Sequence, residues 1–171
     1  MFGHIKRWKT SFGAKTLLGI SCILLGLIAV GIYLSMRLCL FIDTDQGYRL
    51  IVPVNKGDTF SLKYTHSVQK TPVVENFVVV GAGEMVLDST VYQTYGVGLP
   101  FLPGEGHFEQ QGDKFVLTGF GRRFGKLSLH ADEIARHVLE INGRIIPLYA
   151  IHEGGAFIAI RAKPYYYRWI H

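Results

Sequence analysis

The chain has 171 residues, which is enough for one compact domain and one additional element. Its 18 Lys and Arg residues outnumber its 13 Asp and Glu residues, but five of the basic residues lie in residues 1–37, which contain no acid. Residues 43–171 therefore carry equal numbers of both signs, so the basic excess indicates membrane topology and argues against a nucleic-acid-binding domain.

Residues 17–36 form an uncharged apolar segment of 20 residues. As a helix rising ~1.5 Å per residue, this segment would span about 30 Å, the thickness of the hydrocarbon core of a bilayer. Basic residues precede it, and Asp43 and Asp45 follow it, so the positive-inside rule places the N-terminal side in the cytoplasm. We therefore expect a single-pass protein of the cytoplasmic (inner) membrane, with a cytoplasmic basic tail (1–15), a transmembrane anchor and juxtamembrane segment (16–42) and an extracytoplasmic β domain (43–171).

A cleaved signal peptide is the alternative, because a basic start and an apolar run define both kinds of segment. The apolar run continues for five residues beyond the candidate cleavage site at residues 29–31, which favours an uncleaved anchor.

Small residues on one face of this helix would let another membrane helix approach closely: Gly19, Cys22, Gly26 and Ala29. Chance is the competing explanation, since membrane helices are rich in small residues. Both cysteines, Cys22 and Cys39, lie in or beside the run, so the β domain has no disulfide.

Short segments with a period of two follow the anchor and are separated by turn signals, which predicts strands. The expected strands cover residues 48–54, 60–68, 73–80, 85–95, 107–110, 114–118, 137–141, 144–149 and 156–162, with another beginning at 127. Asn142-Gly143 suits a type I′ hairpin turn, residues 101–106 and 119–126 read as loop or turn, and residues 132–136 as one helical turn. This spacing predicts an antiparallel all-β domain, either a β-sandwich or a barrel.

The central stretch carries two motifs, Tyr-Thr-His-Ser-Val at 64–68 continuing into Thr-Pro-Val at 71–73 and Glu75, and Gly-Val-Gly-Leu-Pro at 96–100. Together they resemble the DUF1850 family, over roughly Gly47 to Lys163. The resemblance implies a small anchored or exported domain, often encoded beside tripartite (TRAP-type, TAXI subclass) solute transporters, and establishes no chemistry. We expect ligand or partner contacts around these two motifs, because Gly and Pro permit tight loops at the edge of a sandwich. The residues concerned are Tyr64, His66, Ser67, Thr71, Pro72, Glu75, Gly96, Gly98 and Pro100.

His66 and Glu75 are the pair most able to support acid–base chemistry. If they face one another across neighbouring strands, Glu75 would accept a hydrogen bond from the imidazole and orient it toward a ligand. We favour the alternative, a structural polar pair that fixes strand register. Ser67 points to the opposite face from His66 in a strand, so serine catalysis is not expected, and Ser67 and Thr71 would cap the intervening turn.

No pair of histidines shows a metal-binding spacing, and we expect neither a metal nor another cofactor. Residues 119–126 interleave Gly, Phe, Arg and Lys without matching a phosphate-binding motif, so a solvated hairpin tip is favoured over an anion or lipid site.

Exposed aromatic surface is expected near residue 165, where three consecutive tyrosines occur. These residues would contact the bilayer or a partner unless the segment is frayed: Tyr165, Tyr166, Tyr167 and Trp169.

These features predict a membrane-anchored accessory or binding module rather than an enzyme. From the resemblance, its partner would be the membrane subunit or the solute receptor of a TAXI-type TRAP transporter. The alternatives are an envelope enzyme that uses His66 and Glu75, and a purely structural envelope protein. A pocket containing both side chains would favour the enzyme, and the absence of both a pocket and a transporter contact would favour the structural protein.

Overall fold

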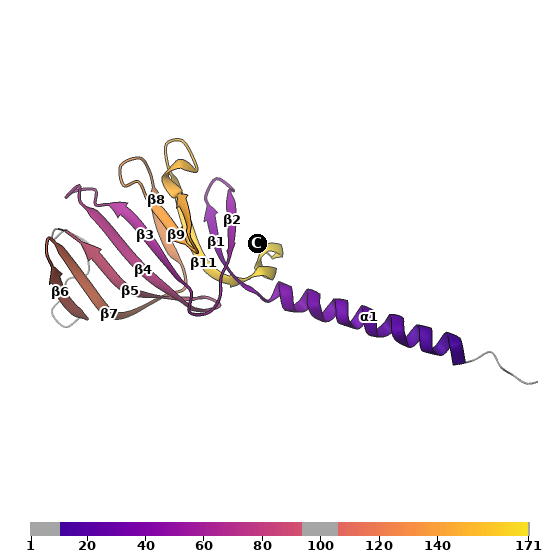
Figure 1. The fold of residues 1–171 in the computed structure, drawn as a ribbon. Helices are drawn as coiled ribbons and strands as arrows, with labels where there is room; N and C mark the ends of the chain where they lie inside the picture. The colour runs from indigo at the N-terminus through magenta and orange to yellow at the C-terminus, as the bar shows by residue number, and fades with distance from the viewer. Residues whose placement is uncertain (1–10, 94–105, 171) are drawn as a thin grey trace, which may run out of the picture. The chain divides into compact units, whose positions relative to one another are not determined.

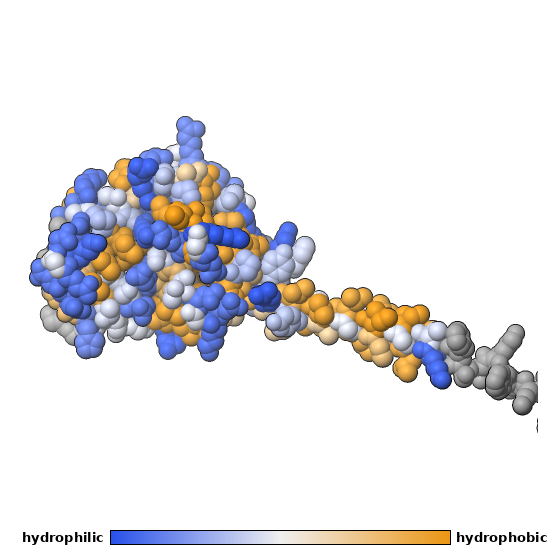
Figure 2. All heavy atoms as spheres, viewed as in Figure 1, coloured by the Kyte–Doolittle hydropathy of each residue, from blue (hydrophilic) through white to orange (hydrophobic). Residues whose placement is uncertain are grey.

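The computed structural model describes residues 11–93 and 106–170, which form two compact units divided after Met36. The first unit is the helix α1, Ser11–Ser35. Its segment Lys15–Ser35 is long and apolar enough to cross a membrane, as an anchor or as a signal sequence. Figure 2 shows apolar side chains over the visible surface of this helix. Such a surface fits hydrocarbon better than water, because apolar area exposed to water costs free energy.

The second unit consists of two antiparallel sheets and two short 3₁₀ turns (Figure 1). The smaller sheet has the order β2-β1-β11-β8: β1 Leu38–Thr44, β2 Arg49–Pro53, β8 Leu127–Ala131 and β11 Ala156–Pro164. The larger sheet has the order β10-β9-β3-β4-β5-β7-β6: β3 Thr59–Thr65, β4 Pro72–Gly81, β5 Glu84–Tyr92, β6 His107–Gln111, β7 Lys114–Phe124, β9 Val138–Ile141 and β10 Arg144–Pro147. The 3₁₀ turns are η1, Leu148–Ala150, and η2, Tyr165–Trp169.

The core lies between the two sheets. Alternate residues of each strand point into it, as the period-two pattern predicts. The smaller sheet contributes Leu40, Ile42, Ile158 and Ile160, and the larger sheet contributes Phe60, Phe77, Met85 and Leu139. The predicted antiparallel all-β domain with one N-terminal apolar helix is therefore confirmed, and of the two architectures named in advance the sandwich is the one observed.

The first strand of the domain begins earlier than the sequence suggested. β1 starts at Leu38, and both Leu40 and Ile42 are fully buried in the core. The boundary expected at residue 43 falls inside this strand. The apolar residues of β1 follow the apolar helix almost without interruption, so composition alone does not separate them.

Two predicted segments are corrected. β3 ends at Thr65, and residues 66–71 form a tight turn in which the His66 N–H donates to the Thr71 carbonyl (2.9 Å). Val68, expected in the strand, lies in that turn and is 70% exposed. The turn expected at residues 119–126 is instead mostly strand, because β7 continues to Phe124 after a bulge opposite β5. Glycine-rich sequence resembles a turn but also accommodates a bulge.

The predicted hairpin at Asn142-Gly143 is confirmed. Both residues have positive φ, 49° for Asn142 and 72° for Gly143, as a type I′ turn requires. The turn joins β9 to β10 and sets their register, with Ile141 opposite Arg144. The hairpin predicted around Gly112 also forms and joins β6 to β7. Residues 132–136 make one helical turn as expected, closed by the Arg136 N–H bonding the Asp132 carbonyl (2.9 Å).

Candidate functional site

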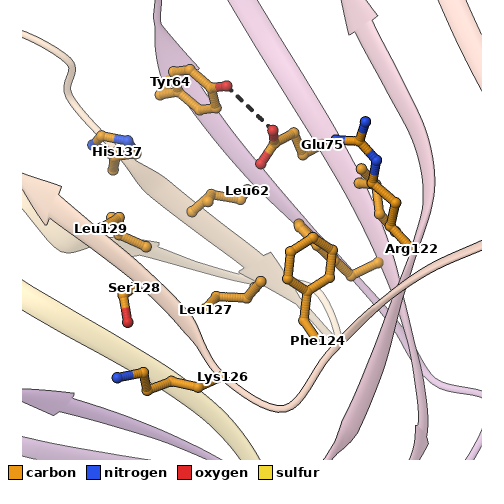
Figure 3. Close-up of a pocket in the computed structure, with 12 residues that line it drawn as sticks. Leu62, Tyr64, Glu75, Arg122, Phe124, Lys126, Leu127, Ser128, Leu129 and His137 are labelled. Atoms are coloured by element: carbon orange, nitrogen blue, oxygen red, sulfur yellow. Dashed lines mark hydrogen bonds between the residues drawn. The ribbon is translucent and has the colours of Figure 1, made fainter. Parts of the chain in front are cut away.

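A cavity of about 430 Å³ lies between the sheets. Figure 3 shows its walls, which combine apolar side chains from both sheets with a small polar group. The residues that line it are Leu62, Tyr64, Glu75, Phe77, Leu87, Arg122, Phe124, Lys126, Leu127, Ser128, Leu129 and His137. This volume and this mixed lining are typical of sites for small organic molecules.

Strand register places an acid on the inner face of the larger sheet. On β3 the inward residues are Phe60, Leu62 and Tyr64, and Glu75 of β4 is the Cα partner of Leu62. Its partner on the other side is Thr90 of β5. Glu75 thus occupies a position that, in a purely structural sandwich, an apolar residue would fill.

Glu75 and Tyr64 form the central polar pair of the cavity. The Tyr64 hydroxyl donates to Oε1 of Glu75 over 3.3 Å (Figure 3). Burial raises the pKa of the Glu75 carboxyl, although the hydrogen bond from Tyr64 works in the opposite direction. Burial, followed by the charge of Glu75 and this hydrogen bond, raises the pKa of the Tyr64 phenol, which therefore keeps its proton. The cavity consequently holds a carboxyl group that protonates readily beside a permanent hydroxyl donor.

His137 completes this polar group. It directly precedes β9, and its imidazole ring stacks on Tyr64 with 5.0 Å between ring centroids. Burial lowers the pKa of His137, so the ring is neutral. Its Nδ1 atom is buried, and within the part of the chain that the structure describes it has no hydrogen-bond partner. A buried polar atom without a partner costs about 1–3 kcal/mol, which is unusual unless a water molecule or ligand satisfies it.

The mouth of the cavity is more polar and carries positive charge. Arg122 of β7 and Lys126, which precedes β8, are both exposed, as is Ser128. Phe124 lies between the two cations in the sequence and forms part of the apolar wall (Figure 3). The cavity therefore has an apolar middle, a carboxyl–phenol–imidazole group on one side and cations at its edge. Such an arrangement suits an amphipathic molecule with an anionic group.

His66 has a different environment from the one predicted for it. It begins the turn after β3, and its Nδ1 atom accepts the backbone N–H groups of Val68 and Gln69, each at 3.2 Å. These bonds act as an internal cap of the turn, a structural role. The hydrogen bond that Glu75 accepts comes from Tyr64, whereas the sequence suggested the imidazole of His66.

The remaining motif residues that the structure describes do not line the cavity. Ser67 is exposed, Thr71 closes the turn through its carbonyl, and Pro72 begins β4. Gly96, Gly98 and Pro100 lie outside the described residues. Of the site predicted from the motifs, the structure brings together Tyr64 and Glu75. The alternation of the strands could have indicated this pair. Tyr64 follows the core residue Leu62 by two positions and Glu75 precedes the core residue Phe77 by two positions, so both side chains point to the inner face.

Sequence reasoning missed the contributions of His137 and Ser128, and it weighed an anion site at residues 119–126, which include Arg122 and Lys126, only as the less favoured alternative to a hairpin tip. They reach the cavity from segments that are distant in the sequence, and no local spacing connects them to Glu75. Among residues 11–93 and 106–170, no three or more His, Cys, Asp or Glu side chains gather as metal ligands would.

The small residues proposed as a helix contact are exposed along α1: Gly19, Cys22, Gly26 and Ala29. A Cβ atom added at Gly19 or Gly26 would meet nothing within 4 Å. At 100° per residue these four positions fall on one side of the helix. Contact of this side with another membrane helix stays a prediction.

A family model described as "Domain of unknown function (DUF1850)" matches residues 60–148. The match begins in β3 and ends at the first residue of η1, so it contains Tyr64, Glu75 and every other residue that lines the cavity. Neither the curated proteins nor the solved structures include a chain that matches this one.

Proposed function

The chain belongs to the DUF1850 family, and from this premise we propose that it is a membrane-anchored accessory module whose domain binds a small organic anion outside the cytoplasm. The observation that carries the proposal is the Tyr64–Glu75 pair inside the cavity. The apolar helix α1 would hold the module at the membrane.

Energetic cost favours a binding role for the polar group. Glu75 stands between core residues, and burial opposes its ionisation. His137 has a buried nitrogen without a partner among the described residues. A leucine or valine at either position would pack more favourably, unless these groups contact something that enters the cavity. A ligand with its own hydrogen-bonding group would satisfy them.

The lining also indicates the class of ligand. The apolar walls, formed by Leu62, Phe77, Leu87 and their neighbours, would bury a hydrocarbon or aromatic body. Arg122 and Lys126 would attract a carboxylate or similar anion at the mouth. A small carboxylic acid with an apolar body meets both requirements.

We propose a transporter as the protein partner, namely the membrane subunit or the solute receptor of a TAXI-type TRAP system. The family resemblance of the two sequence motifs motivates this partner. The accessible stripe of Gly19, Cys22, Gly26 and Ala29 supports contact within the membrane. A domain that binds an organic anion beside a solute transporter would report on, or deliver, the transported compound.

Ligand binding is tested by thermal unfolding of the full-length protein in lipid nanodiscs. The probe is 4-phenylbutyrate, and its neutral analogue 4-phenylbutanol is the control. The carboxylate is expected to raise the unfolding midpoint more than the alcohol does, because ligand binding stabilises the native state. The R122Q/K126Q variant should lose the difference between the two probes. Equal midpoints with and without either probe, up to millimolar concentrations, would contradict the proposed ligand class.

The partner is tested separately by affinity purification of the full-length protein from its native membrane in mild detergent. Mass spectrometry should identify a transporter membrane subunit or receptor in stoichiometric amounts. Gly19→Ile and Gly26→Ile would block close helix approach and should reduce that recovery, whereas Leu24→Ile, on the opposite side of the helix, should not. Recovery of the protein alone would contradict the transporter proposal and leave the ligand proposal standing.

A further inference from the structure

The turn η2 is held beside the point where the chain leaves the apolar helix. The backbone N–H of Tyr165 donates to the carbonyl of Arg37 over 2.8 Å. Arg37 follows Ser35, the last residue of α1, by two positions. In addition, Leu38 of β1 pairs with Pro164 of β11, directly before the turn. These two contacts, together with the chain connection from Ser35 to Arg37, keep η2 close to the end of the helix.

One tyrosine fixes the turn to the smaller sheet. Tyr167 packs edge-on against the buried ring of Phe41, with 5.3 Å between centroids. The ammonium group of Lys163 lies 5.7 Å from the centre of the Tyr167 ring. These contacts cover the outer side of β1 and order the segment, so it is not a frayed end.

The other side of the turn is exposed and apolar. Trp169 is 74% exposed, Ile170 is 60% exposed and Tyr166 is 42% exposed. In a 3₁₀ helix, residues three apart lie one above the other, so Tyr166 and Trp169 share a side. An ordered turn that presents Trp, Ile and Tyr to the outside has an unpartnered aromatic surface.

Positive charge surrounds this surface. Arg37, Lys163 and Arg168 have no carboxylate partner among the residues that the structure describes. The guanidinium of Arg168 lies 5.0 Å from the Trp169 ring and also donates to the Tyr165 hydroxyl (2.6 Å). Both contacts direct Arg168 alongside the aromatic surface. Anions rather than another apolar protein surface would complete this arrangement.

We propose that η2, with Arg37 and Lys163, lies on the bilayer surface at the end of α1 and binds the headgroups of anionic phospholipids. The proposal rests on the proposed function in one respect, since α1 must remain as a membrane anchor. Trp and Tyr favour the membrane interface, and basic residues are attracted to a surface of anionic lipids. The turn would thereby restrict the tilt of the domain on the membrane.

Trp169 serves as its own probe, because the chain contains two tryptophans and W8F leaves Trp169 alone. The full-length W8F protein is reconstituted into vesicles of phosphatidylglycerol and phosphatidylcholine with brominated acyl chains. The control is the W8F/W169F/F157W variant. Phe157 is 65% exposed and lies on β11 seven residues before Pro164, ~23 Å along the strand at about 3.3 Å per residue.

Brominated lipid is expected to quench most of the emission of Trp169 and little of the emission of the F157W control. Replacing phosphatidylglycerol by phosphatidylcholine, or introducing K163Q and R168Q, should decrease the quenching. Unquenched emission from Trp169, or equal quenching of the control, would overturn the proposal. Carbonate extraction of the same vesicles separates this failure from loss of the anchor. A protein that stays in the lipid pellet but is not quenched retains its anchor and lacks the lipid contact of η2. A protein that is released from the pellet would overturn both the anchor and the lipid contact.

Discussion

The hydroxyl of Tyr64 lies 3.3 Å from the carboxylate of Glu75, and the two residues are on adjacent strands of the larger sheet with their side chains directed into the same cavity. The pair introduces hydrogen-bonding groups beside the Leu and Phe side chains that form the apolar part of the cavity wall. Its consequences for stability and for binding can be measured separately.

Glu75→Gln should change how stability depends on pH. The raised pKa means that the folded carboxyl keeps its proton at pH values where the unfolded one, with an ordinary pKa of 4.5, has lost it. The unfolded state then binds fewer protons, so the free energy of unfolding falls as pH rises from 4.5 through the folded pKa. Glu75→Gln has no carboxyl to ionise, so its free energy of unfolding does not fall in this way. At about pH 8 the variant should therefore unfold at a higher temperature than the wild type.

Circular dichroism of the full-length protein in detergent measures these midpoints across the pH range. Glu109→Gln, at an exposed position of β6, controls for loss of one negative charge. A wild type and a Glu75→Gln variant with parallel pH profiles would show that the burial of Glu75 has no energetic consequence.

His137→Phe should retain the ring stack on Tyr64 and remove the buried Nδ1 atom. The pKa of His137 is lowered, so its titration makes the wild type less stable at low pH, whereas the titration of Glu75 makes it less stable at high pH. As pH falls below 6.5 the unfolded imidazole takes up a proton before the folded one does, so the wild type loses stability on acidification. The variant should lose less stability below this pH and gain up to about 1 kcal/mol at neutral pH.

Chemical denaturation at several pH values gives these free energies, and the response to 4-phenylbutyrate gives a second readout. If His137 contacts the ligand, the variant is more stable yet responds less to the probe. A variant that is less stable than the wild type at every pH would show that Nδ1 is satisfied in the native protein.

The sequence predicts the fold well, because the fold depends on local patterns. Period-two alternation located most strands, and Asn142-Gly143 identified its hairpin through the positive φ that both residues adopt. The errors have local causes as well. β1 was merged with the apolar helix that precedes it, and the bulge in β7 looked like a turn.

The site was only partly predictable, because it depends on contacts between distant segments. Tyr64 and Glu75 belong to neighbouring strands and to one sequence motif. His137 directly precedes β9, and Arg122 belongs to β7, which pairs with β5 on the side away from β4. The motif also drew attention to His66, whose ring nitrogen caps its own turn. A single sequence does not distinguish a histidine that stabilises a turn from one that contacts a ligand.

Gly143→Ala should destabilise the domain by about 1 kcal/mol, because an L-residue at φ 72° is strained. Among the described residues, no atom would lie within 4 Å of the added methyl group, so we attribute the expected loss of stability to the backbone conformation. Gly81→Ala is the matched control, since its Cβ also meets nothing and its φ lies outside the positive range. Denaturant titration of both variants provides the comparison. Equal destabilisation would argue against the type I′ turn as the constraint on the β9–β10 hairpin.

Cysteine accessibility tests the orientation proposed for the chain. In a Cys22→Ser background the remaining Cys39 is buried and should not react. Ile134→Cys lies in the turn after β8, where the side chain is 62% exposed, and Lys15→Cys lies at the other end of the apolar helix. If the domain is outside the cytoplasm, a membrane-impermeant maleimide labels Ile134→Cys in intact cells and leaves Lys15→Cys unlabelled until the membrane is opened.

The reverse pattern would invert the topology and place the cavity, and therefore its ligand, in the cytoplasm. Labelling of Ile134→Cys on a protein that lacks residues 1–31 by mass would instead identify α1 as a cleaved signal sequence, and the membrane contact of Trp169 would then lose its basis.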